Sequence, residues 1–204
     1  FSGSIKDWHR FGYVDALRTS FQLIMVDARG HGLSAKPHNG SAYEIKEISA
    51  DVMSVLDATG ITKAHYWGYS MGGRIGFGIA KHFPSRICSL ILGGMHPYMR
   101  DPDERNKQIS SYQRGMEAIV AEMETRSGLL PPDRKNDLLA NDPVALAAST
   151  EATRDDPGIH DVLSIMTMPC LVYVGEEDAA FYEGVARCVK EISKAVFVPL
   201  PGLD

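Results

Sequence analysis

Residues 64–73 read Ala64-His65-Tyr66-Trp67-Gly68-Tyr69-Ser70-Met71-Gly72-Gly73. The first four residues are typical of a strand and the run from Gly73 onward is typical of a helix, so Ser70 falls on the turn between them. A serine on such a sharp turn presents its hydroxyl clear of the backbone, and flanking glycines relieve the crowding that the turn creates. The pattern therefore favours a nucleophilic serine. A tight glycine-rich turn without chemistry is the alternative.

A nucleophilic serine needs helping groups. Its hydroxyl is a weak nucleophile at neutral pH, so Ser70 requires a base, and the base requires a carboxylate that fixes its tautomer. An oxyanion formed beside Ser70 would meet the backbone N–H of Met71, where we expect the helix to begin. The rest of the chain must supply the base, the carboxylate and a second oxyanion donor.

Three further segments, together with the serine turn, resemble the α/β-hydrolase family. Residues 27–34 follow an apolar run at 21–26 and are similar to the family's D-x-R-G-x-G-x-S turn, which we interpret as a structural loop. Residues 171–178 are similar to the strand and loop that carry the family's acid. Residues 1–4 resemble the segment just after the family's His-Gly oxyanion motif, and the His-Gly itself is absent. These matches span almost the whole chain.

The resemblance implies a Ser-His-Asp triad with Ser70 as nucleophile and Asp178 as acid. Glu176 and Glu177 compete with Asp178, which lies farther out on its loop, at the position that matches the family's acid. A solvated acidic loop without a catalytic role is the alternative for these three carboxylates. The resemblance also implies that the oxyanion hole combines the N–H groups of Met71 and Phe1.

The order of the triad exposes a gap. In this fold the histidine follows the acid, yet no histidine follows Asp178. The chain does not begin with methionine, and it stops at Asp204, soon after a strand-like run at 195–199. We therefore expect an internal piece of a longer protein, truncated within the oxyanion loop at one end and just before the catalytic histidine at the other.

The composition fits an enzyme core and excludes several other classes. With 204 residues, 44% of them hydrophobic, the chain can bury one substantial core without disulfides. A net charge of −5 with scattered basic residues makes nucleic acid an unexpected partner. No stretch reaches the roughly 18 apolar residues of a membrane span. Three cysteines indicate reduced thiols in a cytoplasmic protein, two of them, Cys88 and Cys170, beside predicted buried strands.

No motif indicates a metal or a cofactor. No cysteine or histidine pair has ligand spacing, and the glycines near Ser70 surround a serine instead of forming a dinucleotide cradle. We therefore expect neither a metal ion nor a cofactor.

Strands and helices alternate along the chain. We expect strands at 21–26, 64–67, 89–92, 171–174 and 195–198. Helices are expected after a capping box formed by Ser41 and Glu44, from Ser70 to about Phe83, and over 181–192. Alternation of this kind predicts an α/β protein with a mostly parallel sheet covered by helices on both faces.

Residues 95–168 interrupt the alternation, because they contain several helix-like runs and no convincing strand. We expect a helical cap over 95–168, inserted into a hydrolase core formed by 1–94 and 169–204. Such a cap would shape a substrate pocket, for which we expect Tyr69, His96, Met99 and Met123 as substrate-binding residues. Flexible thioethers suit an adaptable acyl-binding wall, and packing within the cap is the alternative for these methionines.

The resulting hypothesis is a cytoplasmic serine hydrolase that cleaves a carboxylic ester, lactone or related acyl bond of a small molecule through an acyl-enzyme on Ser70. A serine at the turn disfavours the dehalogenases and epoxide hydrolases of this fold, which carry aspartate there. Two alternatives stay open. One is a carbon–carbon bond hydrolase or cofactor-free peroxidase of the same fold, and the other is a ligand-binding protein with weak catalysis.

Overall fold

The computed structural model describes residues 3–154 and 156–204. The chain divides into two compact units, one made of Phe1–Glu44 with Asp101–Asp155 and the other of Ile45–Arg100 with Asp156–Asp204.

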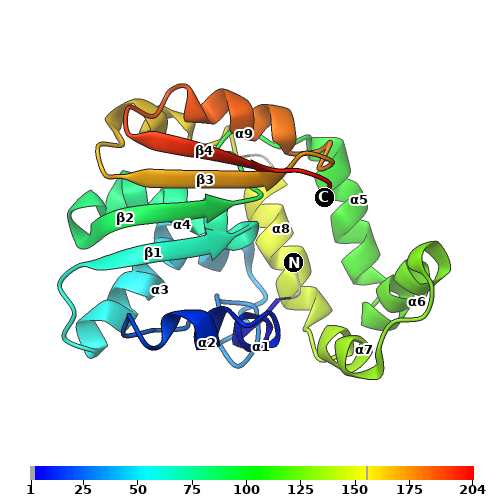
Figure 1. Cartoon of the computed structure of the whole chain (residues 1–204). Coiled ribbons are helices and arrows are strands. Elements are labelled where there is room, and N and C mark those ends of the chain that lie inside the picture. The colour runs from blue at the N-terminus through cyan, green and yellow to red at the C-terminus, as the bar shows by residue number, and fades with distance from the viewer. Residues whose placement is uncertain (1–2, 155) are drawn as a thin grey trace. The chain divides into compact units, whose positions relative to one another are not determined.

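The second unit is built on a four-stranded parallel sheet in the order β1-β2-β3-β4 (Figure 1). The strands are β1 (Ala64–Tyr69), β2 (Ile87–Gly93), β3 (Cys170–Gly175) and β4 (Ala195–Leu200). Their buried residues include Leu90, Leu92 and Val172, which are almost fully inaccessible to solvent. Apolar runs of this kind are typical of strands covered on both faces. The predicted α/β architecture with a parallel sheet is confirmed.

Helices connect and cover these strands. Helix α4 (Met71–His82) packs on β1 and β2, α9 (Tyr182–Val189) packs on β3 and β4, and α3 (Ile45–Ala58) packs on α4. Two short 3₁₀ helices, η2 (Pro84–Arg86) and η3 (His160–Ile165), complete this unit. Helix α4 brings the backbone close to its neighbours through its glycines, since a Cβ on Gly76 would lie 2.4 Å from the Leu92 side chain.

The predicted capping box at Ser41 and Glu44 does not form. Asn39 accepts the N–H of Ala42 at 3.2 Å and begins the 3₁₀ helix η1 (Gly40–Tyr43), so Ser41 lies inside a turn. Glu44 is extended, and α3 begins after it. Helix α3 ends at Ala58, and Gly60 follows it with a φ of 72°, which suits a glycine after a helix.

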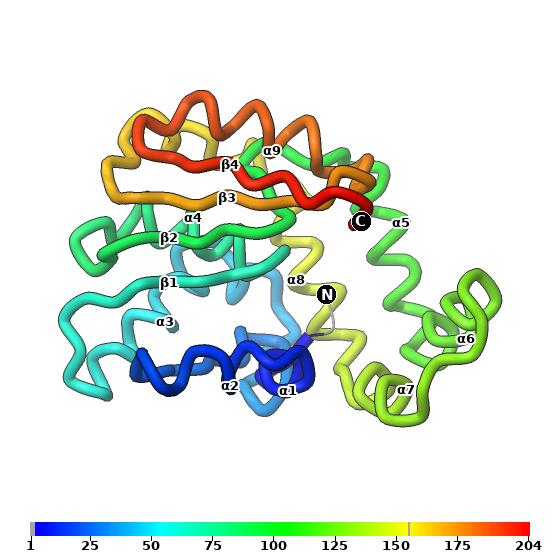
Figure 2. The backbone as a smooth tube through the Cα atoms, viewed as in Figure 1, coloured from blue at the N-terminus to red at the C-terminus, as the bar shows by residue number. Residues whose placement is uncertain are grey.

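The first unit is helical. Its elements are α1 (Ile5–Arg10), α2 (Tyr13–Leu17), η1, α5 (Pro102–Gln113), α6 (Met116–Ser127), α7 (Pro132–Leu139) and α8 (Pro143–Arg154). Along the chain, helices α5 to α8 follow β2 and precede β3, as the tube in Figure 2 shows. Their core contains Ile109, Tyr112, Met116 and Leu146. Residues 101–154 form no strand, and the cap boundaries at 95 and 168 remain a prediction.

The predicted strand at 21–26 does not form. This segment has no assigned secondary structure and pairs with no described segment, and a strand exists only through hydrogen bonds to a neighbour. Its side chains are correspondingly open to solvent, with Phe21 55% and Met25 37% exposed.

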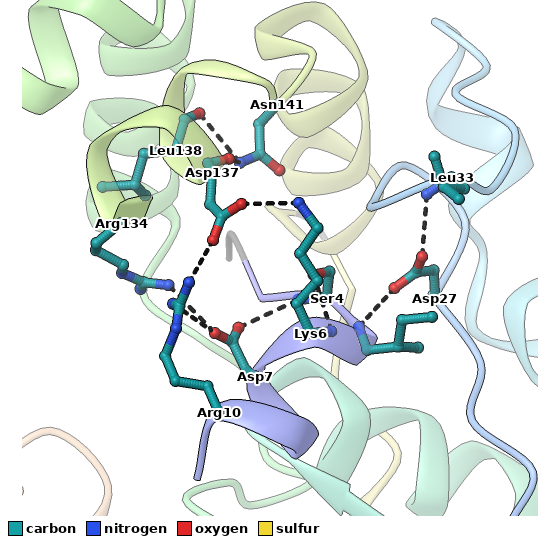
Figure 3. Close-up of polar contacts among 11 residues, drawn as sticks. Ser4, Lys6, Asp7, Arg10, Asp27, Leu33, Arg134, Asp137, Leu138 and Asn141 are labelled. Carbon is teal, nitrogen blue, oxygen red and sulfur yellow. Dashed lines mark hydrogen bonds and ion pairs between the residues drawn. The ribbon is translucent and has the colours of Figure 1, made fainter. Parts of the chain in front are cut away.

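The turn at 27–34 has the structural role that the sequence indicates. The Asp27 carboxylate accepts the N–H groups of Ile5, at 2.8 Å, and Leu33, at 3.0 Å, which ties the turn to α1 (Figure 3). A Cβ on Gly32 would lie 2.0 Å from this carboxylate, so the contact requires glycine. His31 in the same turn is buried, and its burial lowers its pKa.

Charged side chains join α1 to α7 (Figure 3). Asp137 forms ion pairs with Lys6 at 3.0 Å and with Arg10 at 2.6 Å. Asp7 forms an ion pair with Arg10 at 3.1 Å. The hydrogen bonds from Lys6 and Arg10 lower the pKa of Asp137. This cluster holds the N-terminal helix against the helices that follow residue 101 within the first unit.

Two ion pairs connect helix α4 with the segment that follows residue 155. Arg74 pairs with Asp156, and both side chains are largely buried, while Lys81 pairs with Asp161 at 2.8 Å, where the carboxylate is 64% exposed. Asp156 also accepts the N–H of Gly158 at 2.7 Å. The buried pair therefore holds the start of this segment on α4.

We predict that Asp156→Asn destabilises the protein by about 3 kcal/mol, because it leaves the Arg74 guanidinium buried without its partner charge. Asp161→Asn is the matched control and should cost less than about 1 kcal/mol, since an exposed pair is well screened. Urea unfolding of both variants measures the difference. Equal losses would contradict the assigned role of the buried pair.

Candidate active site

Ser70 has a strained backbone at the junction of β1 and α4. Its φ is 51° and its ψ is −112°, and no other described residue except glycine has a positive φ. The Ser70 N–H donates to the carbonyl of Gly93 at 2.8 Å, and its own carbonyl accepts the N–H of Arg74 at 3.1 Å. Strain of this kind persists only where the surroundings enforce it, and it is common at functional sites. The turn predicted from the sequence is present, with β1 ending at Tyr69 and α4 beginning at Met71.

The glycines around Ser70 have different tasks. A Cβ on Gly68 would lie 2.3 Å from the carbonyl group of Gly72, and a Cβ on Gly73 would lie 2.9 Å from Met95. Gly72 itself has room, because the nearest atom to its Cβ would be the Tyr66 hydroxyl at 3.8 Å. The tight turn therefore needs glycine at 68 and 73, and the expectation that Gly72 also relieves crowding is wrong.

Asp178 lies on the loop after β3. Its carbonyl accepts the N–H groups of Phe181, at 3.1 Å, and Tyr182, at 2.9 Å, so the first turn of α9 holds its backbone. The Asp178 side chain is half-buried, whereas Glu176 and Glu177 are exposed. Partial shelter from water favours Asp178 among the three carboxylates as a group that orients a base.

The sheet brings both loops to one edge. The strands are parallel, and Ser70 follows β1 while Asp178 follows shortly after the end of β3, with β2 between them. Ligands of such sheets bind beyond the carboxyl ends of the strands. The ring of Tyr69 stacks on that of Tyr173, with centroids 6.1 Å apart, and remains 52% exposed at this edge.

His96 is buried just beyond the end of β2, with 9% of its surface exposed. Its ring lies 5.4 Å from that of Tyr98 and 5.6 Å from that of Phe181. Burial is the main cause that lowers the pKa of His96, to about 4, and the positive charges of Arg100 and Arg74 contribute less. The imidazole is therefore neutral at physiological pH.

The remaining predicted residues are spread over the chain. Met71 is half-buried at the start of α4, and Met99 is 55% exposed after β2. Met123 is half-buried on α6 and belongs to the other unit. Phe1 lies outside the described residues. The second unit thus contains Ser70, Met71, Tyr69, His96, Met99 and Asp178.

The predicted cap at 95–168 contains six methionines, and four of them have a packing role. Their side chains are buried, with 1% to 7% of their surface exposed: Met95, Met116, Met166 and Met168. Of the six, only Met99 and Met123 keep surface that a substrate can contact.

Sequence reasoning missed the pair between Arg74 and Asp156. An arginine four residues after Ser70 within an apolar helix is the one signal that pointed to a buried partner, because arginine is almost never buried unpaired. Its partner lies 82 residues away in the sequence. Such pairing depends on tertiary contact and escapes local patterns.

The cysteines only partly follow the expectation. All three are free thiols, but Cys88 is exposed, while Cys170 and Cys188 are buried. Burial raises the pKa of both buried thiols to about 12, which makes them unreactive. The expectation of a buried thiol at Cys88 is wrong, because its side chain falls on an open position of β2.

Within residues 3–154 and 156–204 there is no cluster of three or more metal-ligating side chains. None of the helices described is both long and apolar enough to cross a membrane.

Comparison with known proteins settles the family. The model of the alpha/beta hydrolase fold matches residues 1–139. This chain belongs to the α/β-hydrolase family. The match covers the serine turn, the turn at 27–34 and most of the helical segment that follows β2.

This α/β hydrolase is similar to known enzymes. It is 27% identical to a putative 2-succinyl-6-hydroxy-2,4-cyclohexadiene-1-carboxylate synthase of Bacillus subtilis, over 89% of this chain and 72% of the relative. It is 27% identical to 3-oxoadipate enol-lactonase 1 of Acinetobacter baylyi, over 81% of this chain and 64% of the relative. A hydrolase from Pseudomonas aeruginosa superimposes with a TM-score of 0.86 at 26% identity, over 99% of this chain and 79% of that one. These similarities support an enzymatic function.

We predict that Gly68→Ala destabilises this α/β hydrolase by about 1–3 kcal/mol, because the added methyl group collides with the backbone of Gly72. Gly72→Ala is the matched control in the same motif and should be neutral or slightly stabilising, since its Cβ meets only ordinary contacts and alanine favours the helix. Thermal unfolding measures both changes. A larger loss for Gly72→Ala would contradict this account of the turn.

Proposed function

We propose that this α/β hydrolase is a serine hydrolase that cleaves a carboxylic ester, lactone or related acyl bond through an acyl-enzyme on Ser70. The observation that carries the proposal is the positive φ of Ser70 between the end of β1 and the start of α4. A serine held there presents its hydroxyl at the carboxyl edge of the sheet.

In the proposed mechanism the Ser70 Oγ attacks the substrate carbonyl carbon while its proton passes to a histidine base. The carbonyl oxygen becomes an oxyanion, which accepts a hydrogen bond from the N–H of Met71 at the start of α4. The protonated base then gives its proton to the departing alkoxide, which leaves an acyl group on Ser70. Water, activated by the same base, cleaves this ester and releases the acid. Asp178 holds the base in the required tautomer.

We propose that the base of this triad is a histidine that follows the acid, as in the triad order of this fold. His96 lies just beyond the carboxyl end of β2, but it is a poor base, because a catalytic base works best with a pKa near the operating pH. The pKa of His96 is only about 4. This contrast supports a separate histidine that follows the acid.

The similar enzymes support a narrower substrate class. One relative is named an enol-lactonase, and another is named a synthase of a cyclohexadiene carboxylate. We propose a small-molecule lactone or ester as substrate, with Tyr69 and Met99 of the second unit as pocket residues, because both keep exposed surface near the carboxyl edge of the sheet. His96 is buried and is not among them. Carbon–carbon bond hydrolysis, cofactor-free peroxidation and ligand binding with weak catalysis remain the alternatives. The free thiols support a reducing compartment such as the cytoplasm.

We predict that Ser70→Ala abolishes turnover of an aryl ester such as p-nitrophenyl butyrate by the full-length protein. Asp178→Asn should lower kcat by about 10⁴, because the base then adopts the wrong tautomer. Glu177→Gln is the matched control on the same loop and should retain nearly full activity, since its side chain is exposed. Steady-state kinetics of the three variants measures these effects. Full turnover in Ser70→Ala would refute the nucleophile, and inactivity of Glu177→Gln alone would move the acid to that position.

We predict that Met99→Glu shifts the preference among acyl chain lengths, because a charge in the pocket disfavours long apolar chains. The loss is about 1–3 kcal/mol for each methylene that no longer has an apolar contact. Met25→Glu is the matched control, a partly exposed methionine that we place outside the pocket. The ratio of kcat/KM for acetyl and octanoyl esters measures the preference. An identical change for every chain length would show that Met99 does not contact the acyl group.

A further inference from the structure

The loop that carries Asp178 is fixed from two directions. Backbone hydrogen bonds from Phe181 and Tyr182 hold the Asp178 carbonyl at the start of α9. The first turns of α9 in turn lie against His96, whose ring is 5.6 Å from that of Phe181. The placement of Asp178 therefore depends on a contact with the segment that follows β2.

The contact between His96 and α9 is unusually close. A Cβ on Gly184 would lie 2.2 Å from Cδ2 of His96, so no other residue at position 184 leaves room for the imidazole. Nδ1 of His96 is buried without a hydrogen-bond partner among the described residues. The described contacts of the ring are therefore with its two aromatic neighbours, Tyr98 and Phe181.

Three arginines lie near this contact, together with two carboxylates: Glu191, which accepts the Tyr98 hydroxyl at 2.7 Å, and Asp156, which pairs with Arg74. The guanidinium carbon of Arg100 lies 4.3 Å from the centre of the Phe181 ring, and that of Arg187 lies 4.5 Å from the centre of the Tyr98 ring. Arg74 on α4 adds a further positive charge near His96. A protonated imidazole would be repelled by this environment, so a ring without charge suits the position.

We propose that His96 is a positioning residue, whose ring packs against Phe181 and Gly184 and thereby places the backbone of Asp178 at the carboxyl edge of the sheet. This inference rests on the proposed function in assigning Asp178 the role of the acid. His96 itself takes no proton from Ser70.

The test compares His96→Ala, His96→Phe and Gly184→Ala with the wild type in the full-length protein. In His96→Ala we expect faster hydrogen exchange at the amides of Phe181 and Tyr182, and a fall in kcat on the order of 10²-fold with little change in KM. The acid limb of the pH profile of kcat/KM should move to lower pH, because a displaced Asp178 no longer raises the pKa of the base.

Two variants separate packing from proton transfer. His96→Phe should recover most of the lost kcat, since it restores a ring without an ionisable nitrogen. Gly184→Ala should act like His96→Ala, because its methyl group displaces the imidazole. Gly40→Ala is the matched control and should leave exchange and kcat unchanged, as its Cβ would be 3.6 Å or more from its neighbours.

Wild-type kcat and an unmoved pH profile in His96→Ala would overturn the proposal. So would turnover in His96→Phe as low as in Ser70→Ala, which would make His96 the base. Equal turnover in wild type and Ser70→Ala would refute the proposed function instead. Hydrogen exchange at Phe181 and Tyr182 would then still decide whether His96 holds the loop, and unchanged exchange in His96→Ala would refute it.

Discussion

The close approach of Gly68 to Gly72 is the contact on which the candidate site depends. The end of β1 and the start of α4 meet so tightly that a single Cβ at Gly68 would lie 2.3 Å from backbone atoms. Between these two glycines lies Ser70, which adopts a positive φ of 51°. The strain is offset by the surrounding packing and by the hydrogen bond from Ser70 to Gly93 on β2. The strand β1, the turn and the helix α4 thus together hold the backbone of Ser70 in place.

The acid loop uses a similar device on β3. A Cβ on Gly175 would lie 2.1 Å from the carbonyl oxygen of Leu203, so the segment after β4 passes directly over the end of β3. The N–H of Glu177 donates to that carbonyl at 2.9 Å. The proposed acid is therefore held by three neighbours: the segment after β4, the start of α9, and the contact of α9 with His96. In both loops a glycine permits a close approach between backbone segments.

Local patterns predicted the features that local chemistry controls. The sequence predicts the four paired strands, the turn at Ser70 and the structural turn at 27–34. Each of these depends on neighbouring residues or on runs of apolar side chains. The segment at 21–26 was wrongly predicted as a strand, since its apolar composition says nothing about whether a partner is present. Burial of His96 and the pairing of Arg74 with Asp156 are tertiary facts, and they join residues that no periodicity connects. The turn that carries Ser70 was therefore predictable from the sequence, whereas the tertiary contacts around the candidate site were not.

The most direct test of nucleophilic catalysis by Ser70 is mass spectrometry of the full-length protein, acid-quenched during turnover of p-nitrophenyl butyrate. We expect a mass increase of one butyryl group, located by peptide mapping at Ser70. An active protein that accumulates no adduct at Ser70, even when a slowly deacylating ester is used, or that carries the acyl group on another residue, would contradict this mechanism.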